Sequence, residues 1–185
     1  MGDSRAPEKK HMKIDKTISL AFYTPPLTDP SWMNRFVANY SKYPFSHCEL
    51  IFNDGMATSI LSGGNIFFKR RTYASAHYTI KAMPVTHQSH ERMYSFAMEQ
   101  ATKGVKFSNM AMLSPVFKWR VSSDSVGTFC SKYIAQVLQH GGVEWSVGID
   151  PDYSTPATIY DAMSKAPNLC FNTVQYKLDR MNLLI

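Results

Sequence analysis

The sequence predicts a mixed fold of helices and strands within one domain, and three observations support that prediction. Residues 17–24 alternate apolar and polar side chains, which is typical of a half-buried strand. The turn sequence at 53–55 ends in glycine and separates two apolar runs, as in a hairpin. Residues 127–142 carry apolar side chains at helical spacing and end in two glycines. Since the chain has 185 residues, of which 44% are hydrophobic, it is long enough for one well-buried core.

The remaining elements follow from the same periodicities and from start and stop signals. We expect strands at 17–24, 46–52, 56–62, 66–71, 77–83 and 169–178. We expect helices at 29–40, 86–104, 127–142 and 155–165. Thr86 caps the second of these helices, and Thr155 with Pro156 opens the last. Residues 106–125 show no regular period and contain Pro115, so we interpret them as an ordered loop that runs into the cysteine-bearing helix.

The charge balance points to no dedicated polyanion binder. The net charge of +6 comes from 20 basic and 14 acidic side chains, which favours acidic partners only weakly. Lys69, Arg70 and Arg71 follow two aromatic residues, so this run is a candidate for weak binding of nucleic acid or an acidic headgroup. A solvated strand end is the simpler interpretation.

Cysteine usage and the absence of apolar spans set the expected compartment. The chain has three cysteines, Cys48, Cys130 and Cys170, with no Cys-x-x-Cys pair, so a disulfide framework is not indicated. No stretch reaches the length of a membrane span, and residues 1–14 do not have the pattern of a secretory signal. We therefore expect a cytoplasmic protein with a tail at 1–14 and one domain at 15–185. Cys48 and Cys170 are expected to be inert core thiols.

Cys130 is the candidate nucleophile because it lies at the start of the predicted helix at 127–142. It precedes Ile134 by four residues, so its thiol shares the buried face of that helix. The unpaired N–H groups and the positive dipole end of a helix N-terminus favour thiolate over thiol, and they also supply donors for an oxyanion. The alternative is that Cys130 is a small buried hydrophobic residue, as most free cysteines are.

A thiolate needs a base, and His47 is the strongest candidate among the six histidines. It lies at the start of the predicted strand at 46–52, where Glu49 shares its face and Cys48 lies on the opposite one. A satisfied structural histidine on a sheet is the alternative.

A third group usually orients the imidazole, and we expect it on the partner strand of the hairpin. If the hairpin has a three-residue loop, the pairing places Ser59 on the face of His47. If it has a two-residue turn, Ser62 faces His47, with Thr58 nearby. Either register supplies a hydroxyl, which orients the ring without adding charge. Glu49 is a charged but weaker candidate.

Metal and cofactor sites are not indicated by the sequence. His77, His87 and His90 lie near one another, but no His-Glu-x-x-His motif and no cysteine pair completes a site. We expect neither a metal nor a cofactor.

Taken in order, these segments resemble the circularly permuted NlpC-type papain-like proteins, in which the histidine precedes the cysteine. The resemblance rests on Ser-His-Cys-Glu-Leu-Ile-Phe at 46–52, the hairpin turn at 53–55, Thr-Phe-Cys-Ser-Lys-Tyr-Ile at 128–134 and Ser-Thr-Pro-Ala-Thr-Ile-Tyr at 154–160. It covers roughly residues 17–162. The group includes YiiX-like peptidases, relatives of lecithin:retinol acyltransferase, and proteins of bacteria and large DNA viruses.

The resemblance implies an α+β papain-like core, in which an antiparallel sheet packs against the cysteine-bearing helix. It makes Cys130 the nucleophile and His47 the base of a cysteine–histidine dyad. It also places the orienting position, twelve residues after the histidine, on Ser59. Members of the group more often carry histidine, glutamate, asparagine or glutamine at that position.

We therefore expect a thiol protease or amidase, a hydrolase that forms an acyl-enzyme on Cys130 with a peptide or isopeptide substrate. We favour this class because no hydrophobic anchor follows the site. One alternative is a lipid-directed thiol acyltransferase or phospholipase that uses the same dyad on an acyl-lipid. The other is a non-catalytic binding module that keeps the fold, because Ser59 departs from the usual pattern.

Overall fold

The computed structural model describes residues 14–40, 42–117 and 127–166, which fold around a five-stranded antiparallel sheet. The order of the strands in the sheet is β4-β3-β2-β1-β5. The strands are β1 (Ile14–Tyr23), β2 (His47–Phe52), β3 (Met56–Ile60), β4 (Ile66–Arg70) and β5 (Tyr78–Thr86).

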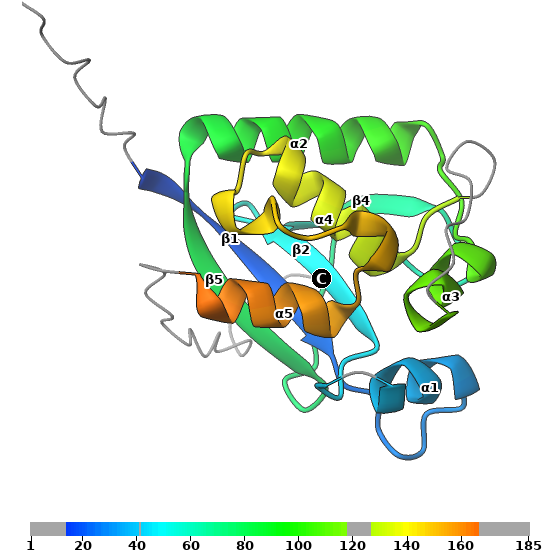
Figure 1. Ribbon diagram of the computed structural model, residues 1–185. Helices are drawn as coiled ribbons and strands as arrows, with labels where there is room; N and C mark the ends of the chain where they lie inside the picture. The colour runs from blue at the N-terminus through cyan, green and yellow to red at the C-terminus, as the bar shows by residue number, and fades with distance from the viewer. Residues whose placement is uncertain (1–13, 41, 118–126, 167–185) are drawn as a thin grey trace, which may run out of the picture.

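Helices cover one face of this sheet, so the described residues form a mixed α+β fold. Figure 1 shows α2, α4 and α5 in front of the sheet and α1 set apart at the lower right. Within the described ranges, each helix is too short or too polar to cross a bilayer. The helices are α1 (Trp32–Tyr40), α2 (His87–Thr102), α3 (Asn109–Phe117), α4 (Cys130–His140) and α5 (Pro156–Lys165), with short 3₁₀ turns η1 (Glu144–Ser146) and η2 (Pro151–Tyr153).

The apolar core lies between the sheet and the helices α2, α4 and α5, which cover one face of the sheet. Because side chains alternate along a strand, β2 directs Cys48 and Leu50 to this face, and both are fully buried. They belong to one apolar cluster with Ile134 and Leu138 of α4. Helix α4 approaches α2 closely at Gly141, where a Cβ would lie 2.4 Å from a side-chain carbon of α2. The sheet therefore positions α4, and α4 positions Cys130.

The structure confirms most of the predicted strands and helices. It also confirms the cap at Thr86, whose side chain accepts a hydrogen bond from the Ser89 N–H over 3.1 Å. One strand is longer than expected, because β5 continues through Pro84 to Thr86. Proline is tolerated there because β5 is an edge strand whose only partner in the sheet is β1.

Three predictions at the chain's less regular segments need correction or lie outside the described residues. The expected loop at 106–125 begins with α3, a helix at 109–117 whose start is capped by Ser108 Oγ, which accepts from the Ala111 N–H over 3.1 Å. Its apolar residues show no clear helical period, so the sequence pattern did not predict a helix here. Of the tail expected at 1–14, Ile14 already pairs with Thr86 as part of β1, and residues 1–13 lie outside the described residues. The strand expected at 169–178 lies outside the described residues.

Candidate functional site

The β2–β3 hairpin has the three-residue loop of the two registers considered. Leu50 lies opposite Thr58, and Gly55 donates its N–H to the Phe52 carbonyl over 3.0 Å. The φ of Gly55 is 83°, in the left-handed region where a side chain would be strained, so this glycine fixes the loop. The register places His47 at the open end of the hairpin, away from the turn.

Cys130 is the first residue of α4, and backbone contacts fix the chain that leads into it. The Thr128 N–H donates to the Lys106 carbonyl over 2.9 Å, and the Ser108 N–H donates to the Thr128 carbonyl over 2.8 Å. Gly127 is required because a Cβ there would lie 2.0 Å from the Lys106 oxygen. Gly127, the first residue of the helix predicted at 127–142, therefore permits this close approach.

Polar side chains in the first turn of α4 hold it against the following segment. Ser131 Oγ donates to the Ser154 carbonyl over 3.0 Å. Lys132 is buried and pairs with Asp152 of η2 at 2.6 Å. Since both bonds come from the two residues that follow Cys130, they fix the first turn of α4 and with it the position of the Cys130 sulfur.

The structure brings Cys130 and His47 together: both line the same hollow, and each shifts the pKa of the other. Their residues are 6% and 9% exposed. A hydrogen bond from Cys48 and the charge of His47 lower the pKa of Cys130 well below its usual value, against the effect of burial. Burial alone would lower the pKa of His47, but the Cys130 thiolate and Glu49 raise it to about 9. The arrangement therefore favours a thiolate–imidazolium pair.

Glu49 is the carboxylate partner of His47. Its Oε1 lies 3.3 Å from His47 Nε2. Its Oε2 accepts from the Tyr73 hydroxyl over 2.8 Å and lies 3.3 Å from Arg71 Nε. Although Glu49 is fully buried, which would raise its pKa, the His47 and Arg71 contacts outweigh this effect and the pKa is lowered. The charges thus alternate along a row of four groups: the Cys130 thiolate, the His47 imidazolium, the Glu49 carboxylate and the Arg71 guanidinium.

The hydroxyls expected at the imidazole have other contacts. Ser59 lies on the expected face, but its hydroxyl donates to the Cys48 carbonyl over 2.7 Å. Thr58 donates to a main-chain oxygen of β4 over 2.9 Å, and Ser62 is exposed beyond the end of β3. Among the described residues, the side chain that pairs with the imidazole besides Cys130 is Glu49. A buried imidazolium needs a compensating charge, which a hydroxyl does not supply.

Cys48 is buried, as expected of a core thiol, but it contacts Cys130. Burial raises the pKa of the Cys48 thiol well above its usual value, so it keeps its proton and donates to the Cys130 sulfur. Strand alternation places Cys48 on the face opposite to Glu49, and α4 packs on the Cys48 face. Because Cys130 lies at the end of α4, it reaches both Cys48 and the strand-end side chain of His47. The third cysteine, Cys170, lies outside the described residues.

Cys130 lies where two hollows meet. The histidine-side hollow has a volume of about 460 Å³, and its lining includes Tyr23, Asn34, His47, Leu61, Met112 and Cys130. A much smaller niche of about 30 Å³ lies on the other side, and its lining includes Tyr40, Ser46, Phe129, Cys130, Ser154 and Thr155. Beyond the niche is the lysine-side hollow of about 510 Å³, which shares Tyr40 and Thr155 with it. Cys130 lines the histidine-side hollow and the niche, and the lysine-side hollow is their neighbour; the three are called the cleft below.

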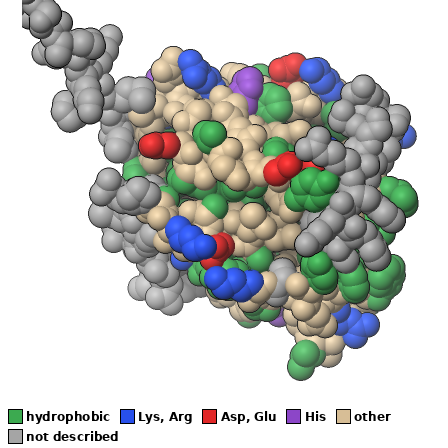
Figure 2. All heavy atoms as spheres, in the orientation of Figure 1, with side chains coloured by type: hydrophobic (Ala, Val, Ile, Leu, Met, Phe, Trp, Pro, Cys, Tyr) green, Lys and Arg blue, Asp and Glu red, His purple; other side chains and the backbone are tan. Residues whose placement is uncertain are grey.

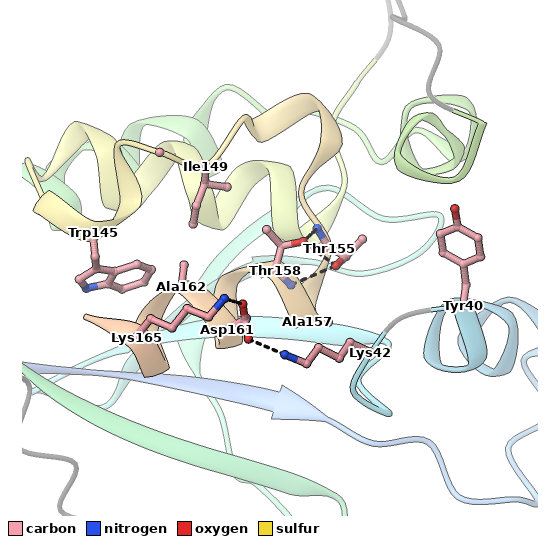
Figure 3. A pocket seen from close by; sticks show the side chains of 11 residues that line it. Tyr40, Lys42, Trp145, Ile149, Thr155, Ala157, Thr158, Asp161, Ala162 and Lys165 are labelled. Atoms are coloured by element: carbon pink, nitrogen blue, oxygen red, sulfur yellow. Dashed lines mark hydrogen bonds and ion pairs between the residues drawn. The ribbon is translucent and has the colours of Figure 1, made fainter. Parts of the chain in front are cut away.

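The lysine-side hollow combines apolar walls with a charged edge (Figure 3). Lys42 and Lys165 converge on Asp161, with nitrogen–oxygen distances of 3.0 and 2.5 Å. Hydrogen bonds from Lys165 and Lys42 lower the pKa of Asp161 to about 2. Trp145 and Ile149 lie along the other side of the hollow in the same view. Two ammonium groups against one carboxylate leave this end of the cleft with one net positive charge.

The three residues of the basic run at 69–71 line one hollow of about 420 Å³ together with Thr72. Arg71 turns inward to Glu49, whereas Lys69 and Arg70 are exposed. Arg70 pairs with Met56 at the turn end of β3, and His47 lies at the other end of the hairpin. The exposed part of the run is therefore remote from the cleft.

No comparison adds a family to this geometry. Family models, curated proteins and solved structures were compared with the chain, and none matches it. Within residues 14–40, 42–117 and 127–166, no three His, Cys, Asp or Glu side chains gather as a metal site. Assignment of function rests on the cleft, on the charged groups around Cys130 and on the sequence resemblance.

Proposed function

We propose that the protein is a papain-like cysteine hydrolase of the circularly permuted NlpC type, acting as a peptidase or amidase. The observation that carries the proposal is the contact between Cys130 and His47 at the start of α4. An antiparallel sheet packed against the cysteine-bearing helix, with the histidine on a strand earlier in the chain, is the arrangement that the sequence resemblance implies.

The proposed reaction proceeds through a covalent acyl-enzyme. The Cys130 thiolate attacks the carbonyl carbon of an amide or ester, and the π electrons move to the oxygen, where the Cys130 N–H donates to it. The carbonyl then re-forms, the bond to the leaving amine or alkoxide breaks, and the His47 imidazolium gives that group its proton. Water, deprotonated by His47, attacks the thioester and releases the acid and the thiolate.

In this mechanism Glu49 takes the orienting role that the sequence assigned to Ser59. Its carboxylate holds one side of the imidazole and stabilises the positive charge that His47 carries while Cys130 is a thiolate. Arg71 and Tyr73 position the carboxylate in turn. Glutamate two residues after the histidine supplies the charge that a serine at the usual orienting position does not.

The shape of the cleft supports an extended substrate. Hollows of about 460 and 510 Å³ lie on the two sides of the niche at Cys130, so a chain can pass the sulfur with groups bound on each side. The net positive charge at the lysine-side hollow favours an acidic group on the substrate at that end. This arrangement fits a peptide or isopeptide better than a small amide.

The proposal is tested by trapping the acyl-enzyme. We expect the purified chain to react with activity-based probes that carry peptide or ubiquitin-like recognition elements, with the added mass on Cys130 in peptide mapping. Cys130→Ala is the control and should carry no label at this position. If no acylating probe modifies Cys130 in the folded protein, the hydrolase assignment is wrong and the non-catalytic binding module is favoured.

A lipid-directed acyltransferase or phospholipase is the second candidate, and the surface of α1 favours it. Trp32, Phe36 and Tyr40 follow one another at helical spacing, with ring centroids 6.4 and 6.3 Å apart, and all three are exposed. Figure 2 shows hydrophobic side chains grouped at the lower right, where Figure 1 places α1. Because Tyr40 also lines the niche, this aromatic ridge lies beside the site. Exposed aromatic residues on a short helix are typical of segments that lie in a membrane interface.

Vesicles separate the two candidates. The peptidase assignment predicts no fatty-acid release from phosphatidylcholine and phosphatidylserine vesicles and no effect of Trp32→Ala on acylation by a peptide probe. Binding to the vesicles with Cys130-dependent fatty-acid release, both reduced by Trp32→Ala, would establish the lipid-directed candidate instead. Arg92→Ala, an exposed change on α2, is the matched control.

A further inference from the structure

One buried hydroxyl at the cleft has no role in the dyad. Ser46 is 7% exposed, and its Oγ has no hydrogen-bond partner among the described residues. Its backbone is fixed, because the Ser46 N–H donates to the Tyr23 carbonyl over 2.9 Å. An unpaired buried hydroxyl costs stability, so its presence at a cleft calls for a partner that arrives with the substrate.

The Ser46 side chain borders the space beside the reacting sulfur. Ser46 and Cys130 line both the niche and the histidine-side hollow. The niche is small, about 30 Å³, against about 460 Å³ for the histidine-side hollow. It therefore has room for a small group such as a carbonyl oxygen.

A backbone donor borders the same space. The first main-chain bond of α4 runs from the Tyr133 N–H to the Phe129 carbonyl, so the Cys130 N–H precedes it and has no acceptor within the helix. Phe129, the N-cap residue, makes no side-chain capping bond. Ser46, with its unpaired hydroxyl, and Cys130, with its helix N-terminal N–H, thus border the same small niche.

We propose that the Ser46 hydroxyl is the side-chain donor of an oxyanion hole located in the niche. This inference rests on the proposed function. When the Cys130 sulfur bonds to a carbonyl carbon, the negative charge that develops on the oxygen is held by the Ser46 O–H and the Cys130 N–H. Ser46 keeps its proton throughout, and the leaving group takes its proton from His47. The energetic cost of the unpaired hydroxyl in the free protein is recovered in the transition state.

Two reactions of the same sulfur distinguish this role from mere support of the neighbouring His47. Acylation by p-nitrophenyl acetate passes through a tetrahedral oxyanion, and its rate is read from the burst of p-nitrophenolate. Alkylation by iodoacetamide displaces iodide at a saturated carbon and forms no oxyanion. A donor in the oxyanion hole speeds the first reaction only, whereas a residue that positions His47 affects both.

The test compares Ser46→Ala with the native full-length chain. We expect the burst rate to fall roughly 10²-fold, as for loss of one oxyanion-hole donor. We expect the rate of iodoacetamide labelling at Cys130 to stay unchanged and the Tm to stay equal or rise, because the variant removes an unpaired buried hydroxyl. Ser146→Ala is the matched control: its hydroxyl is also buried but donates to the Val143 carbonyl over 2.7 Å, so its Tm should fall while the burst rate is retained.

Three results would overturn the inference. They are an unchanged burst rate in Ser46→Ala, an equal loss in both reactions, and a loss confined to the steady-state rate after the burst. Failure of the proposed function has a different signature, because the native chain would then show no Cys130-dependent burst at all.

Discussion

Both faces of β2 carry buried side chains, but the two faces differ in the kind of group that they bury. One face directs Cys48, Leu50 and Phe52 into the apolar cluster beneath α4 and α2. The other carries His47 and Glu49, and Glu49 is fully buried. Burial of the first face stabilises the fold through removal of apolar surface from water. Burial of the second costs desolvation of charged groups, which their mutual contacts must offset.

This contrast separates the residues that stabilise the fold from those that set the charge around Cys130. The apolar face can be replaced by other side chains of similar size at small cost. On the polar face, each charged side chain is stabilised by the opposite charge of its neighbour. Loss of Leu50 or Phe52 from the apolar face should reduce stability alone, while loss of a residue from the polar face should also change the reactivity of Cys130.

The largest effect is expected for Glu49→Ala, which leaves Arg71 and a charged His47 without their carboxylate. Breaking a buried ion pair in this way costs about 3–5 kcal/mol of unfolding free energy. Urea denaturation measures it, and iodoacetamide labelling of Cys130 at pH 6 should slow as well. Glu49→Gln keeps the shape and serves as the control. If labelling stays fast in the folded Glu49→Ala protein, Glu49 does not support the dyad.

Leu50→Ala tests the apolar face. Leu50 is fully buried, and truncation of such a leucine costs about 2–5 kcal/mol. Because Leu50 touches the core and not the dyad, the labelling rate of Cys130 in the folded protein should be retained. Val147→Ala, an exposed apolar truncation, is the control for stability. Slower labelling in Leu50→Ala would show that the two faces are not separate in function.

Tyr73→Phe removes one donor to Glu49 Oε2 and keeps the ring. A hydrogen bond to a charged group contributes about 1.5–3 kcal/mol, and its loss should lower the unfolding free energy and raise the pKa of Glu49. Tyr94→Phe is the matched control, since the Tyr94 hydroxyl donates to an exposed carboxylate, Asp54, over 3.0 Å. Equal effects of the two variants would mean that the Tyr73 bond has no special role at the site.

The smallest effect is expected for Ser59→Ala. The Ser59 hydroxyl donates to the Cys48 carbonyl rather than to the imidazole, so its loss should cost about 0.5–1.5 kcal/mol of stability and leave Cys130 labelling unchanged. Guanidinium denaturation and labelling at pH 6 give the two readouts. A strong loss of labelling would restore Ser59 as the orienting residue and displace Glu49.

Local signals explain how much of the fold and site the sequence predicts. Alternation at β1 and β2, the glycine at position 55 and the capping threonines at 86 and 155 act within a few residues, so strands, helices and the hairpin register options could be read directly. Cys130 and His47 were found in the same way, because a helix start and a strand start each mark a defined position. The register also placed Glu49 and His47 on one face.

What the sequence did not predict depends on contacts across the fold. Tyr73 and Arg71 approach Glu49 from the end of β4 and the segment after it, and no local pattern links them. Cys48 contacts Cys130 because α4 crosses the sheet at that place, which alternation alone does not state. Both hairpin registers predicted a hydroxyl as the partner of the imidazole, although the charge of a buried imidazolium favours a carboxylate. The niche beside Ser46 exists only once α4 and β2 are packed.

The most direct test of the central claim is the rate of iodoacetamide labelling of Cys130 as a function of pH, in the native chain and in His47→Ala. The pKa of Cys130 is lowered and that of His47 is raised to about 9, so the thiolate should already be formed at pH 6 and labelling should be fast there. In His47→Ala the rate should instead rise as the pH increases toward about 8.5, the value of an ordinary thiol. A native Cys130 that titrates near pH 8.5, or a variant with the native profile, would contradict the thiolate–imidazolium pair.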